Sequence, residues 1–361
     1  MPAKIPATVI TGFLGAGKTT LIRHLIENAQ GQRIGLIINE FGDLGVDGSI
    51  VKGCGIEGCE EGDVVELSNG CICCTVADDF MPALKALVDR PVPPDHIVIE
   101  TSGLALPQPL VRAFGWPEIR NRMTVDGVVT VADAAALADG RFANDEAAVD
   151  VQRSADEALE HGTPLSELFE DQLACADMVI VNKSDLLEKD AVDAVMSQMA
   201  NGLRTGVRLI PAELGRVDPA IVLGLGIGAE NDLSNRHEIH HVHDHDHDHD
   251  HDHDHDHDHD HGHDAFESFV VELEEEYDAA ALAERVRAAI ERNGLLRVKG
   301  FAAIAGRPMR LVLQAVGPRI ETYFDRAFEP DEARVTRLVV IGMAGLDQGA
   351  IRMDLAPVRA A

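Results

Sequence analysis

The sequence predicts an α/β protein in which a mostly parallel sheet is followed by a small α+β domain. Over residues 1–227, short β-branched runs alternate with helical stretches, as in parallel sheets covered by helices on both faces. A glycine-rich motif lies between the first such run and the first helical stretch. A histidine-aspartate repeat then separates this part from a C-terminal part with its own strand and helix patterns.

Six apolar runs in the first part are expected to form the strands of its sheet. They lie at residues 8–11, 33–39, 96–100, 125–131, 178–182 and 207–211. Residues 18–28 repeat Leu21, Ile22, Leu25 and Ile26 at helical spacing, which predicts the first helix.

Residues 40–75 are predicted to be a long loop, because they contain eight glycines, many acids and only brief apolar stretches such as residues 64–67. A loop of this length inside a compact domain is usually functional. It also holds five of the six cysteines, so we expect a metal-binding switch loop here.

The C-terminal part begins after a polar segment, residues 228–264, that is predicted to be a disordered linker because it cannot bury apolar surface. Residues 265–361 return to ordinary patterning and are expected to form the α+β domain. Strands are predicted at residues 269–273, 310–314 and 337–341, and a helix at residues 279–290.

The composition excludes several classes of function. A formal net charge of −31 makes nucleic acid and anionic membranes unsuitable partners. No apolar run reaches the roughly 18 residues of a membrane helix, and the N-terminus lacks the pattern of a signal peptide. We therefore expect a cytoplasmic protein, in which clustered cysteines indicate metal binding more than disulfides.

Residues 12–19 read GFLGAGKT and match the P-loop pattern GxxxxGK followed by Ser or Thr. Gly12, Gly15 and Gly17 would let backbone N–H groups surround phosphate at a helix N-terminus. Lys18 would reach the terminal phosphates in a catalytic role, and the Thr19 hydroxyl would be a ligand of Mg²⁺. The alternative, a plain glycine-rich turn, does not require this spacing.

The NKxD motif of Asn182, Lys183 and Asp185 follows a predicted strand, where open α/β sheets bind ligands. The Asp185 carboxylate can accept hydrogen bonds from guanine N1–H and its 2-amino group, a donor pair that adenine lacks. The pattern thus predicts GTP as the nucleotide. Taken alone, the motif is also compatible with a helix-capping loop.

Glu100 ends the predicted strand at residues 96–100 and precedes the sequence TSG. An acid at this point suits the Mg²⁺-side strand of P-loop NTPases, so Glu100 is the second candidate catalytic residue, organising Mg²⁺ or the attacking water. A capping or solvated acid is the alternative.

Cys71, Cys73 and Cys74 place three thiols within four residues. Thiolates suit Zn²⁺, Co²⁺ or Cu(I), and three sulfurs leave an open position for transfer of the metal to a recipient. Buried structural cysteines and a redox thiol are the alternatives. Cys54 and Cys59 are either accessory ligands or incidental.

Two other features concern metal binding less directly. Cys175 precedes a core strand and is expected to be packed. The His-Asp tract, residues 237–264, holds 14 histidines, and it is interpreted as a weak metal reservoir or, alternatively, a solvated spacer.

Together these motifs resemble the CobW family of P-loop GTPases over nearly the whole chain. The resemblance rests on TGFLGAGKTT at 11–20, INEFGD at 38–43, GCICC at 70–74, IVIETSG at 97–103, the NKxD motif, the His-rich linker and the C-terminal domain.

The resemblance implies that GTP and Mg²⁺ preorganise Cys71, Cys73 and Cys74 for Co²⁺, that hydrolysis releases the metal, and that cobaltochelatase is the client. It also adds Thr20 to the nucleotide site, and Glu40 as a residue that would link the metal to Mg²⁺. Because Co²⁺ lies below Zn²⁺ in intrinsic affinity, thiolates alone cannot select it. A Zn²⁺ chaperone or metalloenzyme activator and a passive metal-storage protein therefore remain alternatives.

Overall fold

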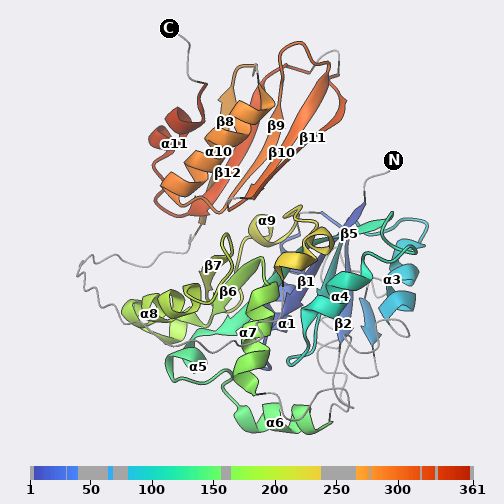
Figure 1. The fold of residues 1–361 in the computed structure, drawn as a ribbon, viewed down its shortest axis with the longest axis vertical. Helices are drawn as coiled ribbons and strands as arrows, with labels where there is room; N and C mark the ends of the chain where they lie inside the picture. The colour runs from blue at the N-terminus through green and yellow to red at the C-terminus, as the bar shows by residue number, and fades with distance from the viewer. Residues whose placement is uncertain are drawn as a thin grey trace.

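The computed structural model describes nine segments of the chain, residues 4–29, 31–39, 64–67, 80–155, 164–236, 266–275, 278–317, 319–329 and 332–357. They form two sheets, each with its own helices (Figure 1). Within these segments, no helix is long and apolar enough to cross a membrane.

The first sheet is parallel throughout, with strand order β3-β2-β4-β1-β5-β6-β7. Its strands are β1 (Ile5–Thr11), β2 (Ile34–Asn39), β3 (Val64–Leu67), β4 (His96–Glu100), β5 (Met123–Asp133), β6 (Met178–Asn182) and β7 (Arg208–Ala212). All six predicted strands are confirmed. The seventh, β3, lies in the interval predicted to be a loop, because its short apolar run pairs with β2 at the sheet edge.

Helices connect these strands. They are α1 (Lys18–Glu27), α3 (Met81–Val88), α4 (Pro107–Ala113), α5 (Ala134–Ala138), α6 (Glu146–Ala155), α7 (Leu165–Cys175), α8 (Lys189–Ala200) and α9 (Pro219–Val222). Strand β6 has apolar packing on both faces: Met178 and Ile180 join one buried cluster, and Val179 and Val181 join another. Since successive strand side chains point to opposite faces, the predicted two-sided covering is confirmed.

The second sheet is antiparallel, in the order β11-β10-β9-β12-β8. Its elements are β8 (Phe266–Leu273), α10 (Ala279–Asn293), β9 (Arg297–Ala302), β10 (Met309–Val316), β11 (Arg319–Ala327), β12 (Thr336–Met343) and α11 (Gln348–Leu355). Alternate strand residues such as Leu313 and Val340 pack with Leu282 and Val286 of α10 and with Ile351 of α11. The predicted α+β class is therefore confirmed.

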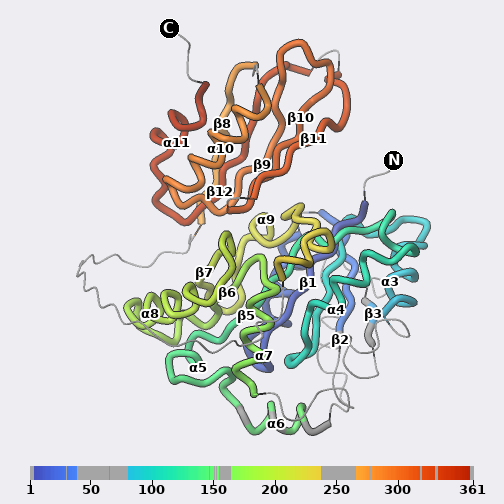
Figure 2. Tube along the Cα trace, viewed as in Figure 1, coloured from blue at the N-terminus to red at the C-terminus, as the bar shows by residue number. Residues whose placement is uncertain are grey.

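The C-terminal domain packs on the first domain through the region of α9, which lies between the two sheets in Figure 2. Leu296, Val316 and Ile341 join the apolar cluster of the first domain. The buried Arg297 donates hydrogen bonds to the carbonyl oxygens of Ala220 and Leu223, the latter at 2.6 Å. Both apolar packing and a buried cation thus hold this contact.

Residues 228–236 differ from the linker that composition predicted. They carry the short 3₁₀ turns η4 (Ala229–Asn231) and η5 (Leu233–Asn235), and both Ala229 and Arg236 are buried. The Arg236 cation can be buried because it pairs with the buried carboxylate of Asp177. The His-Asp tract lies outside the described residues, so the three-part division of the chain stays a prediction.

A buried polar cluster joins β1, β4 and β5. The Thr8 hydroxyl donates to Asp126 at 3.2 Å and lies 2.8 Å from Nε2 of His96. Because the hydroxyl proton is engaged with Asp126, Nε2 of His96 is the donor to Thr8. Burial lowers the pKa of His96, the Asp126 carboxylate opposes that shift, and Arg297 adds to it. The neutral imidazole is therefore the folded form.

We expect the free energy of unfolding to fall on acidification below the ordinary histidine pKa of about 6.5. With its folded-state pKa depressed, His96 binds a proton more readily in the unfolded chain, so stability rises with pH in this window, by up to about 1.4 kcal/mol per pH unit. Urea unfolding of the wild type and His96→Gln between pH 5.5 and 7.5 measures it. Because burial also lowers the pKa of the half-buried His24, His24→Gln should reduce the slope too, but less than His96→Gln does. Equal slopes in the wild type and His96→Gln would contradict the assignment.

Candidate nucleotide-binding site

The P-loop, residues 12–19, connects β1 to α1, as its pattern predicts. Gly12 has φ of 132°, a conformation that residues other than glycine rarely adopt. A Cβ built on Gly12 would lie 2.1 Å from the carbonyl oxygen of Val131 on β5. Glycine is therefore required both by the backbone angle and by the close approach to the neighbouring strand.

The Asn182 side chain joins the P-loop to a second loop. Its Nδ2 donates to the carbonyl of Ala16 at 2.8 Å, and its Oδ1 accepts from the backbone N–H of Gly215 at 2.8 Å. A Cβ on Gly17 would lie 2.2 Å from that same Nδ2. Asn182 is buried, so it holds the P-loop and the turn after β7 in one fixed arrangement.

Lys183 and Ser184 of the NKxD motif are also held by neighbouring groups. Lys183 has φ of 62°, and its ammonium pairs with the buried Asp133 at 2.5 Å. The Ser184 hydroxyl donates to the carbonyl of Ala212 at 3.0 Å. Asp185 follows in the 3₁₀ turn η3 (Ser184–Leu186) and is exposed, so its carboxylate is accessible from outside the protein.

Lys18 begins α1 and is buried, with 7% of its surface exposed. Its ammonium donates to the carbonyl oxygens of Gly12 at 2.8 Å and Phe13 at 3.3 Å. These contacts keep the cation at the P-loop and at the N-terminus of a helix, where anions are favoured. Thr20 lies one residue into the helix beyond Thr19 and is exposed.

Thr19 and Glu100 meet between the P-loop and the end of β4. The Thr19 hydroxyl donates to Oε1 of Glu100 at 3.1 Å, and Glu100 is only 4% exposed. A hydroxyl and a carboxylate oxygen beside a phosphate-binding loop match the oxygen ligands that Mg²⁺ prefers. The residues present therefore fit a Mg²⁺ ion, and the roles predicted for Thr19 and Glu100 stay predictions.

Two residues that hold the nucleotide-binding site in place could not be identified from the sequence. The buried Gln172 of α7 donates its amide to the carbonyl oxygens of Gly103 and Ala105, each at 3.1 Å, and so holds the segment after Glu100. Asp133 at the end of β5 both pairs with Lys183 and accepts from the N–H of Ala136. Neither belongs to a motif, and only the folded chain brings them to the site.

The predicted metal residues Glu40, Cys54, Cys59, Cys71, Cys73 and Cys74 lie outside the described residues. Among the residues that the structure does describe, no group of three or more His, Cys, Asp or Glu side chains could hold a metal ion. Cys175 is buried at the end of α7, as expected, and burial raises the pKa of its thiol to about 11. It is therefore a packed thiol at neutral pH.

The fold and the site together define a P-loop nucleotide-binding protein. The family model described as the CobW/HypB/UreG nucleotide-binding domain matches residues 6–211, and that of the cobalamin synthesis protein cobW C-terminal domain matches residues 266–359. The chain belongs to the CobW/HypB/UreG family, which confirms the resemblance drawn from the motifs.

Two relatives are similar over almost their whole length. The chain is 55% identical over 352 residues to the zinc chaperone CobW of Sinorhizobium sp, covering 97% of this chain and 96% of that one. It is 53% identical over 357 residues to the zinc chaperone CobW of Pseudomonas aeruginosa, covering 98% and 91%. The Zn(II)-bound YjiA GTPase from E. coli aligns over 98% of each chain at 22% identity, with a TM-score of 0.41.

Gly17→Ala should weaken nucleotide binding and lower stability more than Gly15→Ala. Both positions have positive φ, which costs an alanine about 1–2 kcal/mol, but only at Gly17 would the new Cβ displace Asn182. Loss of the two Asn182 hydrogen bonds adds about 1–3 kcal/mol. Urea unfolding and titration with a fluorescent GDP analogue measure both effects. Equal losses in the two variants would show that the Asn182 contact is not needed.

Proposed function

We propose that this chain is a GTP-dependent metallochaperone that carries a divalent metal on Cys71, Cys73 and Cys74 and releases it to a client metalloprotein on GTP hydrolysis. The nucleotide half of the proposal rests mainly on one observation, the Asn182 side chain that holds the P-loop and the turn at Gly215 together. The metal half is supported by the family and by relatives named as zinc chaperones.

Guanine would be selected at the exposed Asp185. Its neighbours Asn182 and Lys183 are fixed by the P-loop and by Asp133, so the position of the carboxylate is set before a base arrives. A preorganised carboxylate loses little freedom on binding the N1–H and 2-amino donors of guanine. Adenine offers no matching pair, and leaving a carboxylate unpaired at the contact disfavours it.

Phosphate would be bound by the P-loop N–H groups and by Lys18. The Lys18 ammonium now donates to neutral carbonyls, and phosphate oxygens are stronger acceptors because they carry charge. Thr19 and Glu100 would hold Mg²⁺, which supplies neutralisation of phosphate charge. Glu100 is also suited to orienting water, since its carboxylate ends β4 beside the P-loop.

The proposed cargo is Zn²⁺ in preference to Co²⁺. The two relatives that are more than half identical are both named zinc chaperones, and Zn²⁺ lies above Co²⁺ in intrinsic affinity for sulfur ligands. Co²⁺ delivered to cobaltochelatase, which the motifs implied, is the second candidate. In either case we propose a cytoplasmic protein whose Glu40 and switch loop, residues 40–75, link the metal to the nucleotide.

Asp185→Asn should shift preference from GTP to xanthosine triphosphate. Xanthine carries a carbonyl where guanine has its 2-amino group, so an amide donor replaces a carboxylate acceptor in the pairing. We expect a loss of GTP affinity of about 10²-fold or more, with XTP affinity rising correspondingly. Competition against a fluorescent nucleotide measures both constants. A variant that loses both nucleotides equally would indicate that Asp185 supports the fold and does not read the base.

Nucleotide should tighten metal binding at one site, and Cys73→Ser with Cys74→Ser should abolish that site. The measurement is competitive titration of Zn²⁺ and Co²⁺, with and without Mg²⁺ and a non-hydrolysable GTP analogue. It uses the chain lacking residues 237–264, with the full chain in parallel, so that histidine sites are counted separately. Cys175→Ser, a packed thiol, is the control.

A metal affinity that is the same with and without nucleotide, or binding of most of the metal by the His-Asp tract, would instead support the storage function. Relative Zn²⁺ and Co²⁺ affinities, set against their cellular availability, then decide between the two proposed cargoes.

A further inference from the structure

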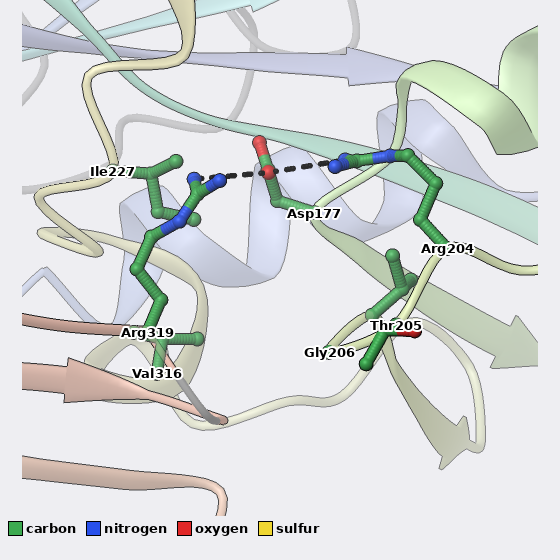
Figure 3. A pocket seen from close by; sticks show the side chains of 8 residues that line it. Asp177, Arg204, Thr205, Gly206, Ile227, Val316 and Arg319 are labelled. Atoms are coloured by element: carbon green, nitrogen blue, oxygen red, sulfur yellow. Dashed lines mark hydrogen bonds and ion pairs between the residues drawn. The ribbon is translucent and has the colours of Figure 1, made fainter. Parts of the chain in front are cut away.

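A cavity of about 220 Å³ lies between the two domains, room for about seven waters at about 30 Å³ each. Its lining residues come from both domains: Asp177, Arg204, Thr205, Gly206, Val207 and Ile227 from the first, and Val316 and Arg319 from the second. Figure 3 shows the guanidinium groups of Arg204 and Arg319 directed toward Asp177 from opposite sides.

The negative charge of Asp177 is already balanced beneath the cavity. The fully buried Arg236 binds it with two parallel hydrogen bonds, at 2.5 and 3.0 Å. The backbone N–H of Val128 donates to the same carboxylate at 2.9 Å. A bidentate pair of this kind satisfies a carboxylate by itself. The two arginines that line the cavity are therefore additional positive charge at Asp177.

Arg204 is held mainly by neutral groups. It donates to the carbonyl oxygens of Ala174 and Ala176 at 2.7 and 2.5 Å, and lies 3.4 Å from Asp177. Carbonyls fix the orientation of a guanidinium without neutralising it. Arg204 is thus a positioned cation on the first-domain wall.

Arg319, on the other wall, pairs with Asp232 and lies 3.8 Å from Asp177. Three guanidinium groups, those of Arg204, Arg236 and Arg319, thus converge on Asp177, and the carboxylate of Glu321 also lies within electrostatic range of Arg319. A fourth guanidinium lies beside Gly317, the residue after Val316: Arg208 Nε is buried, has no hydrogen-bond partner in the described part of the chain, and lies 3.3 Å from a Cβ built on Gly317.

The cavity is separate from the nucleotide site. Asp177 precedes β6, and residues 204–207 precede β7, so they lie at the amino ends of these strands. The P-loop and the NKxD motif follow β1 and β6, at the carboxyl ends. Ile227, Val207 and Val316 add apolar surface to the cavity wall, which suits a ligand with carbon atoms between its charged groups.

We propose that this inter-domain cavity binds a small oxyanion, a carboxylate or phosphate compound, held between Arg204 of the first domain and Arg319 of the C-terminal domain. Guanidinium groups match the planar geometry of carboxylates and the oxygens of phosphates. Because one cation comes from each domain, the anion links the two domains and stabilises their contact. The proposal does not depend on the identity of the metal or of the client.

The test is calorimetric titration of the full chain with citrate and, separately, with inorganic phosphate. A non-hydrolysable GTP analogue and Mg²⁺ are kept saturating, because an open P-loop would bind phosphate too. Mg²⁺ is present at the same concentration in cell and syringe, in excess over citrate, and the heat of its complex with citrate is measured without protein and subtracted. We expect binding of at least one anion, with citrate favoured by the apolar wall. Arg319→Gln should weaken it about tenfold or more, and Arg337→Gln, an exposed arginine paired with Glu272 on the same domain, should leave it unchanged.

A second variant tests whether Arg319→Gln loses anion binding only because the contact between the domains is weakened. Thr205→Trp starts from an exposed position, keeps both arginines and fills the cavity. It should abolish anion binding while the urea midpoint stays that of the wild type. Absence of binding by both anions, or binding that survives in Arg319→Gln and in Thr205→Trp alike, overturns the proposal. Binding of phosphate alone would assign the cavity to phosphate compounds.

Discussion

The nucleotide end of the molecule depends on two backbone approaches that leave no space for a side chain. Gly12 lies against the carbonyl of Val131, and Gly17 lies against the amide of Asn182. In a close-packed interior, a single added methyl at such a point must move either strand or side chain. Because β5 and β6 carry those partners, the P-loop, the sheet and the NKxD motif can adopt their geometry only together.

The segment that begins at Gly215 connects the nucleotide site to the C-terminal domain. Gly215, which donates to Asn182, begins a segment that runs from the carboxyl end of β7 toward the amino end of the sheet. There Arg297 binds the carbonyls of Ala220 and Leu223, and Asp126 accepts from the N–H of Gly226 at 2.7 Å. Residues 215–226 are therefore fixed at both ends, one at the nucleotide side and one at the C-terminal domain.

The sequence predicted the buried strands and the P-loop, because each depends on a pattern among neighbouring residues. The buried parallel strands were found because both of their faces are apolar, as in β6, and the P-loop because its spacing is required by the phosphate it binds. Strand β11 was not predicted, since its exposed edge sequence RIETYFDRA is half polar. The partners of Asn182, Lys183 and Gln172 lie 33 or more positions away, so sequence neighbours give no sign of them.

Buried charge explains how the two ends of the sheet differ. At the carboxyl end, Lys18 is held by carbonyl oxygens of the P-loop and Lys183 by the carboxylate of Asp133. At the amino end, arginines gather around Asp177 and Asp232 in a chain whose net charge is −31. Burying a cation costs several kcal/mol unless it is paired, so a cluster of arginines in so acidic a protein requires a local reason. The domain contact supplies part of it through Asp232 and Asp177, and Arg204, oriented by carbonyl oxygens at the cavity wall, is the first-domain cation that the proposed anion would contact.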